Sequence, residues 1–141
     1  MGLSSEYTPD KEDVPNFINY MKFKAIACFY VQKYNECISI LNELIGSISF
    51  RNFQYSEIEM KLFLAICYLM VNKSELTDGL VKNVKRKLRE YPENEYENAR
   101  VFTKILSGVT GSTEKDREEK VLNLKKRFLI SNQSKFKMLD Y

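Results

Sequence analysis

The stretch FKAIAC at residues 23–28 returns in altered form as FLAICY at residues 63–68. Phenylalanine, alanine and isoleucine hold the same places in both stretches, at a spacing of 40 residues, and Ile18 and Ile58 keep that spacing. A repeat of this length is typical of arrays of helical hairpins, in which each hairpin buries one face on the next. The sequence therefore predicts an all-α fold of stacked antiparallel hairpins.

The composition is that of one soluble helical domain. Of the 141 residues, 44% are hydrophobic and 29% are charged, and the chain is long enough to bury a continuous core. The longest apolar run, residues 62–71, is shorter than a membrane span, which needs about 20 such residues. Residues 1–13 carry several acids and no apolar stretch, so we expect a flexible leader there, with no signal sequence and no membrane contact.

The chain has three cysteines and no histidine. Cys28, Cys37 and Cys67 stand inside apolar helical patterns without metal-ligand spacing, which indicates core residues in a reducing, cytoplasmic compartment and argues against a disulfide framework. Without histidine, Ser-His-Asp and Cys-His catalysis and imidazole zinc sites are excluded. Glycine-rich phosphate loops are absent as well. We therefore expect no catalytic residue, cofactor or metal, and the protein is not predicted to be an enzyme.

Apolar residues recur at three- and four-residue steps along most of the chain, which predicts six to seven helices. Asp13 is a suitable N-cap for the first helix, and Gly46 is a suitable C-cap for the second. Ser56 and Glu59 form a capping-box pattern at the start of the third helix. Pro92 must end the fourth helix near residue 91, because proline cannot continue a helix.

The last third of the sequence predicts a further helix pair. We expect the fifth helix over residues 93–106, a loop over 107–112 and the sixth helix over 114–129. Together the helices form hairpins at about 15–46, 56–91 and 93–130, followed by a short C-terminal helix, in a single domain at 14–141. The aromatic connector, residues 47–55, is expected either to cover the hairpin junction or to form an exposed anchor for a partner.

The helical periodicity also predicts which side chains form the core. They lie on the apolar stripes of the expected helices, at positions that face a neighbouring helix. The predicted core residues are Ala25, Cys28, Ile38, Leu41, Ala65, Ile66, Leu69, Leu80, Val84, Phe102, Ile105, Leu124 and Phe128.

The unit at residues 20–45 resembles a tetratricopeptide (TPR) repeat. Ala25 and Ala27 match the small positions of the family's first helix, and residues 32–37 stand where the family has its turn. In the second unit, Ala65 matches again, but the aromatic residue of the turn is missing. The resemblance covers residues 19–88. It implies a right-handed TPR-like stack with a concave face, and it implies no particular ligand.

A basic stripe is the first candidate for a functional surface. Lys82, Lys85, Arg86 and Arg89 are spaced i, i+3, i+4 and i+7, which places them on one helix face, opposite the apolar side. This face could contact an acidic peptide or phosphates, or it could be a solvated face whose cations suit the negative end of the helix. The net charge of the whole chain is only +3, which argues against nucleic acid.

The concave face is the second candidate. The resemblance places the solvent-side residues of the first and third helices there. A groove of this kind, with lysines beside aliphatic and aromatic surface, suits an extended peptide with some acidic charge. The alternative is that a later helix fills the groove. The predicted groove residues are Asn19, Lys22, Lys24, Ile26, Glu59, Lys61 and Tyr68.

These features predict a non-enzymatic protein–protein interaction module, or scaffold, whose partner is a protein or peptide. The alternative is a nucleic-acid-associated or regulatory helical domain that uses the basic stripe. The apolar stretch at residues 136–139 ends without a cap, which leaves open that the chain self-associates or belongs to a longer array of repeats.

Overall fold

The computed structural model describes residues 11–110, 116, 119–120 and 122–123. These residues form helices and no strand, so the all-α prediction is confirmed. Five helices are described, where six to seven were expected. Of the sixth predicted helix, only positions 116, 119–120 and 122–123 are described, and they are helical. The five helices are α2 (Val14–Tyr30), α3 (Tyr34–Ser47), α4 (Gln54–Met70), α5 (Ser74–Leu88) and α6 (Glu97–Thr110).

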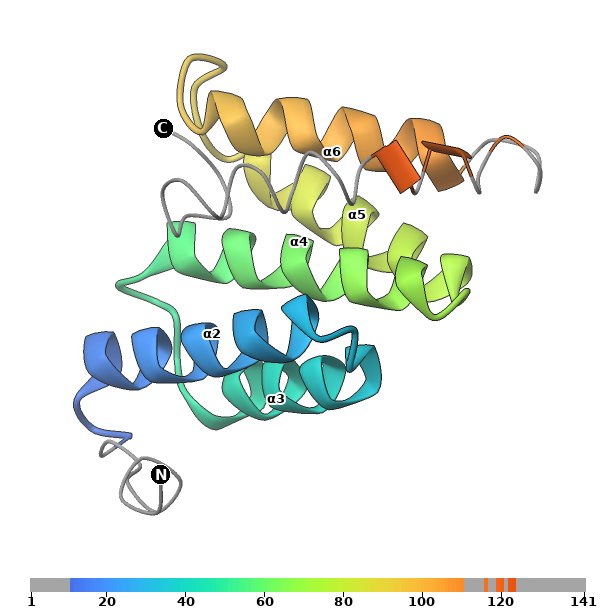
Figure 1. Ribbon diagram of the computed structural model, residues 1–141. Helices are drawn as coiled ribbons and strands as arrows, with labels where there is room; N and C mark the ends of the chain where they lie inside the picture. Colours follow the sequence, from blue (N-terminus) through green and yellow to red (C-terminus); the bar gives the residue numbers. More distant parts are fainter. Residues whose placement is uncertain (1–10, 111–115, 117–118, 121, 124–141) are drawn as a thin grey trace.

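The helices form a stack in which α2, α4 and α6 lie one above the other (Figure 1). Helices α2 and α3 form the first hairpin, and α4 and α5 form the second, with α6 packed on the second hairpin. Among the described residues, no helix is long and apolar enough to span a membrane.

The 40-residue period of the sequence is a period of the structure. Helices α2 and α4 begin 40 residues apart and have the same length, 17 residues, and α3 and α5 also begin 40 residues apart. Both turns contain one residue with a left-handed backbone, Gln32 and Asn72, each with φ of 63°. In each turn the next amide, of Lys33 or Lys73, donates to a carbonyl of the preceding helix at 2.8 Å. Local hydrogen bonds therefore reverse the chain in the same way twice.

Helix α4 holds the centre of the core. Its apolar run is buried on nearly every face, because α4 contacts α3, α5, α2 and α6. Phe63 is fully buried, and its ring meets that of Phe29 edge-to-face, with centroids 5.6 Å apart. Ala25 and Ala65 are both 0% exposed. Both repeated alanines therefore lie inside the core.

The predicted core is largely confirmed where the structure describes it. Ala25, Leu41, Ala65, Ile66, Leu69 and Val84 are buried. Others are half-buried and pack against the core, namely Cys28, Ile38, Leu80, Phe102 and Ile105. Leu124 and Phe128 lie outside the described residues.

Two of the predicted helix caps are wrong. Helix α4 begins at Gln54, with Phe53 at the N-cap position, so Ser56 and Glu59 lie inside the helix. Packing decides this start, because Phe50 is buried and Phe53 is half-buried against the core. The connector therefore covers the hairpin junction. Gly46 lies inside α3, which ends at Ser47, and does not act as a C-cap.

The fifth predicted helix is shifted along the chain. It runs over Glu97–Thr110 instead of 93–106, so residues 107–110 are helical and not a loop, and α5 ends at Leu88 instead of near residue 91. At the far end, burial of Val109 keeps the chain helical past Gly108. At the near end, Tyr96 has a left-handed φ of 56°, which interrupts the helix.

Arg100 holds the connection between α5 and α6. Its Nε donates to the Glu95 carbonyl at 2.9 Å, and its Nη2 lies 2.9, 3.1 and 3.0 Å from the carbonyl oxygens of Leu88, Tyr91 and Pro92. A guanidinium suits this role, because it offers several donors in one plane and places positive charge at the negative end of α5. One side chain of α6 therefore binds the end of α5 and the loop that follows.

Replacing Arg100 with alanine should lower the free energy of unfolding by about 2 kcal/mol, since hydrogen bonds to a charged group are worth about 1.5–3 kcal/mol each and water replaces part of them. Urea denaturation followed by circular dichroism measures the change. Arg100→Lys should recover only part of the loss, because an ammonium lacks the planar set of donors. Wild-type stability in both variants would contradict this role.

Candidate functional site

Lys22, one of the predicted groove residues, forms an ion pair between two helices. Its Nζ lies 3.1 Å from Oε1 of Glu59, and the two side chains are 14% and 6% exposed. The pair joins α2 to α4. Glu59 is buried and so is Ile26, so the expectation that these two residues face solvent is wrong. The physical reason is the close approach of α2 and α4, which turns this side of both helices into an interface.

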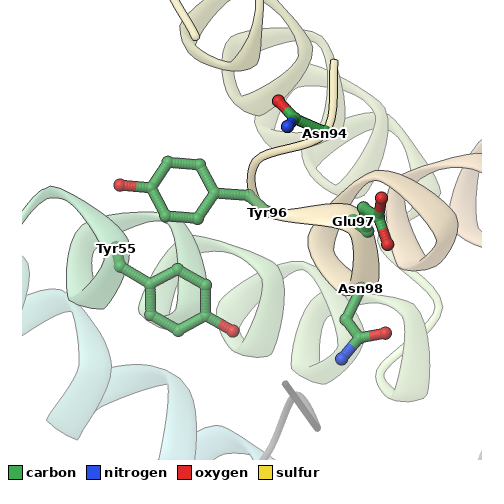
Figure 2. Close-up of a pocket in the computed structure, with 5 residues that line it drawn as sticks. All are labelled: Tyr55, Asn94, Tyr96, Glu97 and Asn98. Carbon is green, nitrogen blue, oxygen red and sulfur yellow. The ribbon is translucent and has the colours of Figure 1, made fainter. Parts of the chain in front are cut away.

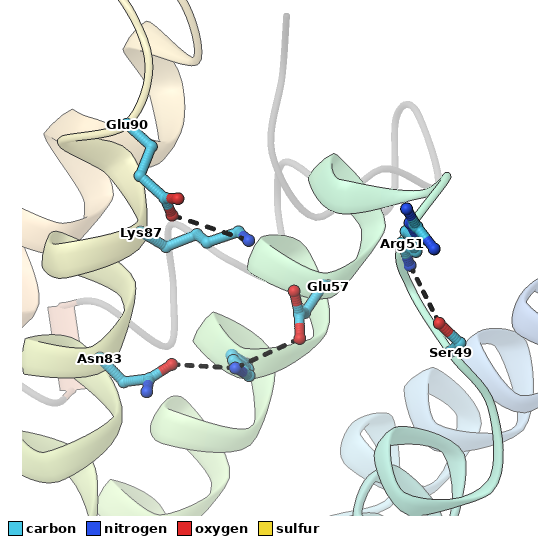
Figure 3. A network of polar contacts seen from close by, with 7 residues as sticks. Ser49, Arg51, Glu57, Asn83, Lys87 and Glu90 are labelled. Atoms are coloured by element: carbon cyan, nitrogen blue, oxygen red, sulfur yellow. Dashed lines mark hydrogen bonds and ion pairs between the residues drawn. The ribbon is translucent and has the colours of Figure 1, made fainter.

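Lys61 and Tyr68 also connect helices. The Lys61 Nζ donates to Oδ1 of Asn83 on α5 at 2.9 Å and lies 3.4 Å from a carboxylate oxygen of Glu57 (Figure 3). The Tyr68 hydroxyl accepts a hydrogen bond from Nδ2 of Asn42 on α3 at 3.2 Å. Of the lysines in the predicted groove, only Lys24 is exposed.

The basic stripe on α5 is exposed, as its spacing predicts. Lys82 pairs with Asp78, one turn earlier, at 3.0 Å. Lys85, Arg86 and Arg89 are exposed and make no ion pair with another described residue. Three cations of the stripe therefore have no acidic partner among the residues that the structure describes.

Helix α6 extends this positive surface. Lys85 lines a hollow of about 440 Å³ between α5 and α6 together with Arg100 and Lys104, and Glu93 is the one acid among the described residues that line it. The floor contains Leu88 and Thr103, which are 3% and 2% exposed. Lys104 is absent from the sequence-predicted set. The signal that could have found it is the four-residue step from Arg100 to Lys104 on one helix face.

A second pocket, of about 480 Å³, lies at the start of α6 (Figure 2). Its lining includes the rings of Tyr55 and Tyr96, whose centroids are 5.2 Å apart, and Tyr91 meets Tyr96 edge-to-face at 5.0 Å. Asn94, Glu97 and Asn98 supply polar groups. These tilted and edge-to-face rings pack around Tyr96, whose backbone is left-handed. They also cover each other, which leaves less ring surface to a ligand.

Within the part of the chain that the structure describes, no group of three or more Cys, Asp or Glu side chains could hold a metal ion. The acids of the connection before α6, Glu93 and Glu95, are exposed, and so is Glu97 at the start of α6. Residues with the burial and mutual contacts of an acid–base pair are not found among them.

Comparison with known proteins finds no relative of this chain. The chain matches no protein-family model, no curated protein and no solved structure.

Proposed function

We propose that this chain is a non-enzymatic protein–protein interaction module of the TPR-like type, which binds an acidic segment of a partner protein. The binding surface is the α5–α6 basic face, defined by Lys85, Arg86, Arg89 and Lys104. The observation that carries the proposal is that Lys85 and Lys104, from two different helices, line one hollow.

The charge of this face favours a negative partner. The four cations are exposed, and Arg100, whose guanidinium is held by backbone carbonyls, adds positive charge at the same place. Several like charges on one surface produce a potential that attracts an oppositely charged segment and speeds its association.

The floor of the hollow favours a side chain over a free ion. The Leu88 side chain, 3% exposed, lines the hollow beside Lys85 and Lys104, and the Thr103 hydroxyl already donates to the Ala99 carbonyl at 2.6 Å. A glutamate side chain of a partner would place its methylene groups over Leu88 and its carboxylate between Lys85 and Lys104. A partner segment rich in glutamate therefore fits the chemistry of this face.

The predicted groove on α2 and α4 supports the proposal less. Lys22 and Lys61 contact acids and amides of neighbouring helices, so that a partner would have to replace these contacts. The repeated hairpins and their TPR-like pattern of small residues support an interaction module on either surface, because stacks of this kind expose long helical faces.

Reversing the basic face tests the proposal. The triple variant Lys85→Glu, Arg86→Glu and Arg89→Glu should weaken binding of a fluorescein-labelled, glutamate-rich peptide by roughly tenfold to a hundredfold, if each exposed pair contributes up to about 1 kcal/mol. Fluorescence anisotropy at low salt measures the affinity. Binding should also weaken as salt is added, because exposed charges are screened.

A matched control makes the same change in net charge at other positions on the surface. Lys11→Glu, Lys33→Glu and Lys73→Glu alter three exposed lysines outside the face and should leave the peptide affinity within a few-fold. Equal losses in both triple variants would contradict a defined site. Tighter binding of duplex DNA than of the peptide, lost only in the face variant, would favour the nucleic-acid-associated alternative.

A further inference from the structure

Two thiols meet between the first and second hairpins. Cys37 of α3 and Cys67 of α4 are both 0% exposed, and their Sγ atoms are 3.1 Å apart. Cys28 of α2 is half-buried, and its Sγ lies 3.9 Å from a carboxylate oxygen of Glu36. The described structure therefore contains one close sulfur pair and a third thiol with a different neighbour.

The repeat explains why the pair forms here. Cys37 is the 40-residue counterpart of Thr77, and both are fully buried in the first turn of the second helix of a hairpin. Thr77 donates from Oγ1 to the Ala65 carbonyl at 2.9 Å, within its own hairpin. Cys37 instead meets a side chain of the next hairpin. A bond between Cys37 and Cys67 would therefore join successive hairpins.

We propose that Cys37 and Cys67 form an intramolecular disulfide when the folded protein meets a small two-electron oxidant, and that this bond locks α3 onto α4. The sulfur atoms are about 1 Å farther apart than in a disulfide, whose S–S bond is about 2.05 Å. Formation of the bond therefore requires the two Sγ atoms to approach each other by about 1 Å.

The chemistry balances with a diazene such as diamide as the oxidant. The first thiol adds across the N=N bond, which forms an S–N bond and leaves its proton on the other nitrogen. The second sulfur attacks the first, so that the S–S bond forms, the S–N bond breaks and the second proton goes to nitrogen. Two electrons and two protons leave the protein, and the diazene becomes a hydrazine.

The surroundings of the pair determine how fast it reacts. Burial raises the pKa of the Cys67 thiol, and the neighbouring Cys37 raises it further. The thiolate that must attack is therefore scarce, and the oxidant must enter a closed interface. Burial and the Glu36 carboxylate also raise the pKa of Cys28. We expect the disulfide to form slowly, with local opening of the α3–α4 interface as the limiting step.

Peptide mapping of the folded wild-type chain tests the proposal directly. After treatment with diamide, free thiols are alkylated in denaturant and the digest is examined by mass spectrometry. The expected product is a linked pair of peptides that contain Cys37 and Cys67, lighter by two hydrogens, with Cys28 alkylated. The melting temperature should rise on the order of 10 °C, because the closed loop restricts the unfolded chain, and dithiothreitol should reverse the rise.

Single variants supply the control. Cys28→Ala should still form the disulfide and show the rise in melting temperature, whereas Cys37→Ala should show neither. A linkage through Cys28, or alkylation of both Cys37 and Cys67 after treatment of wild type, would overturn the proposed site. A Cys37–Cys67 linkage without a rise in melting temperature would overturn the proposed locking of the hairpins.

Discussion

Replacing Phe63 with alanine should lower the free energy of unfolding by about 3–5 kcal/mol, the usual cost of removing a phenylalanine ring from a packed core. Phe63 is 0% exposed at the centre of α4, and its ring meets Phe29 of α2 edge-to-face. The variant loses both the buried area and this contact between hairpins, and the helices can close only part of the cavity. Urea denaturation followed by circular dichroism measures the loss. Because a small domain has only about 5–15 kcal/mol of stability, the variant should melt far below wild type.

The repeat provides a matched control for this experiment. Phe23 is the 40-residue counterpart of Phe63, yet its side chain is 51% exposed. Phe23→Ala should therefore change the free energy of unfolding by less than about 1 kcal/mol. Similar losses in the two variants would show that α2 and α4 do not have the different environments described above.

Replacing Lys22 with methionine should lower the free energy of unfolding by about 3 kcal/mol, because it leaves the Glu59 carboxylate buried without its ammonium partner. The pair spans α2 and α4 at 3.1 Å, with Glu59 only 6% exposed. Methionine keeps most of the volume of the lysine stem, so the loss reports the charge and not a cavity. Thermal and urea denaturation at pH 7 measure it.

The double variant Lys22→Met, Glu59→Met distinguishes the contribution of the ion pair to stability from that of side-chain packing. Removing both charges should restore most of the lost stability, because apolar residues of similar size often replace a buried ion pair at little cost. Lys82→Met serves as a surface control. It breaks the exposed pair with Asp78 and should leave stability nearly unchanged. If Lys22→Met lowered the free energy of unfolding no more than Lys82→Met, the structural role of the buried pair would be contradicted.

Much of the architecture could be predicted from the sequence because it depends on local patterns. The spacing of apolar residues identifies the helices, and the 40-residue period places the two equivalent turns at Gln32 and Asn72. Helix periodicity and turn hydrogen bonds join residues only a few positions apart, so a sequence contains nearly all of the information that they need. The exposed basic stripe on α5 was predictable for the same reason.

Contacts between distant residues required the tertiary structure. The start of α6 depends on a guanidinium at Arg100 that binds carbonyls up to 12 residues away. Lys22 and Glu59, 37 residues apart, neutralise each other only because α2 packs against α4, and the hollow between Lys85 and Lys104 exists only because α6 packs against α5. Residue types and spacings determined by themselves that this chain forms paired helices with a positive face. Packing decided which lysines contact a neighbouring helix and which two cysteines meet. Such contacts depend on the three-dimensional proximity of residues that are distant in the sequence, and no local pattern encodes that proximity.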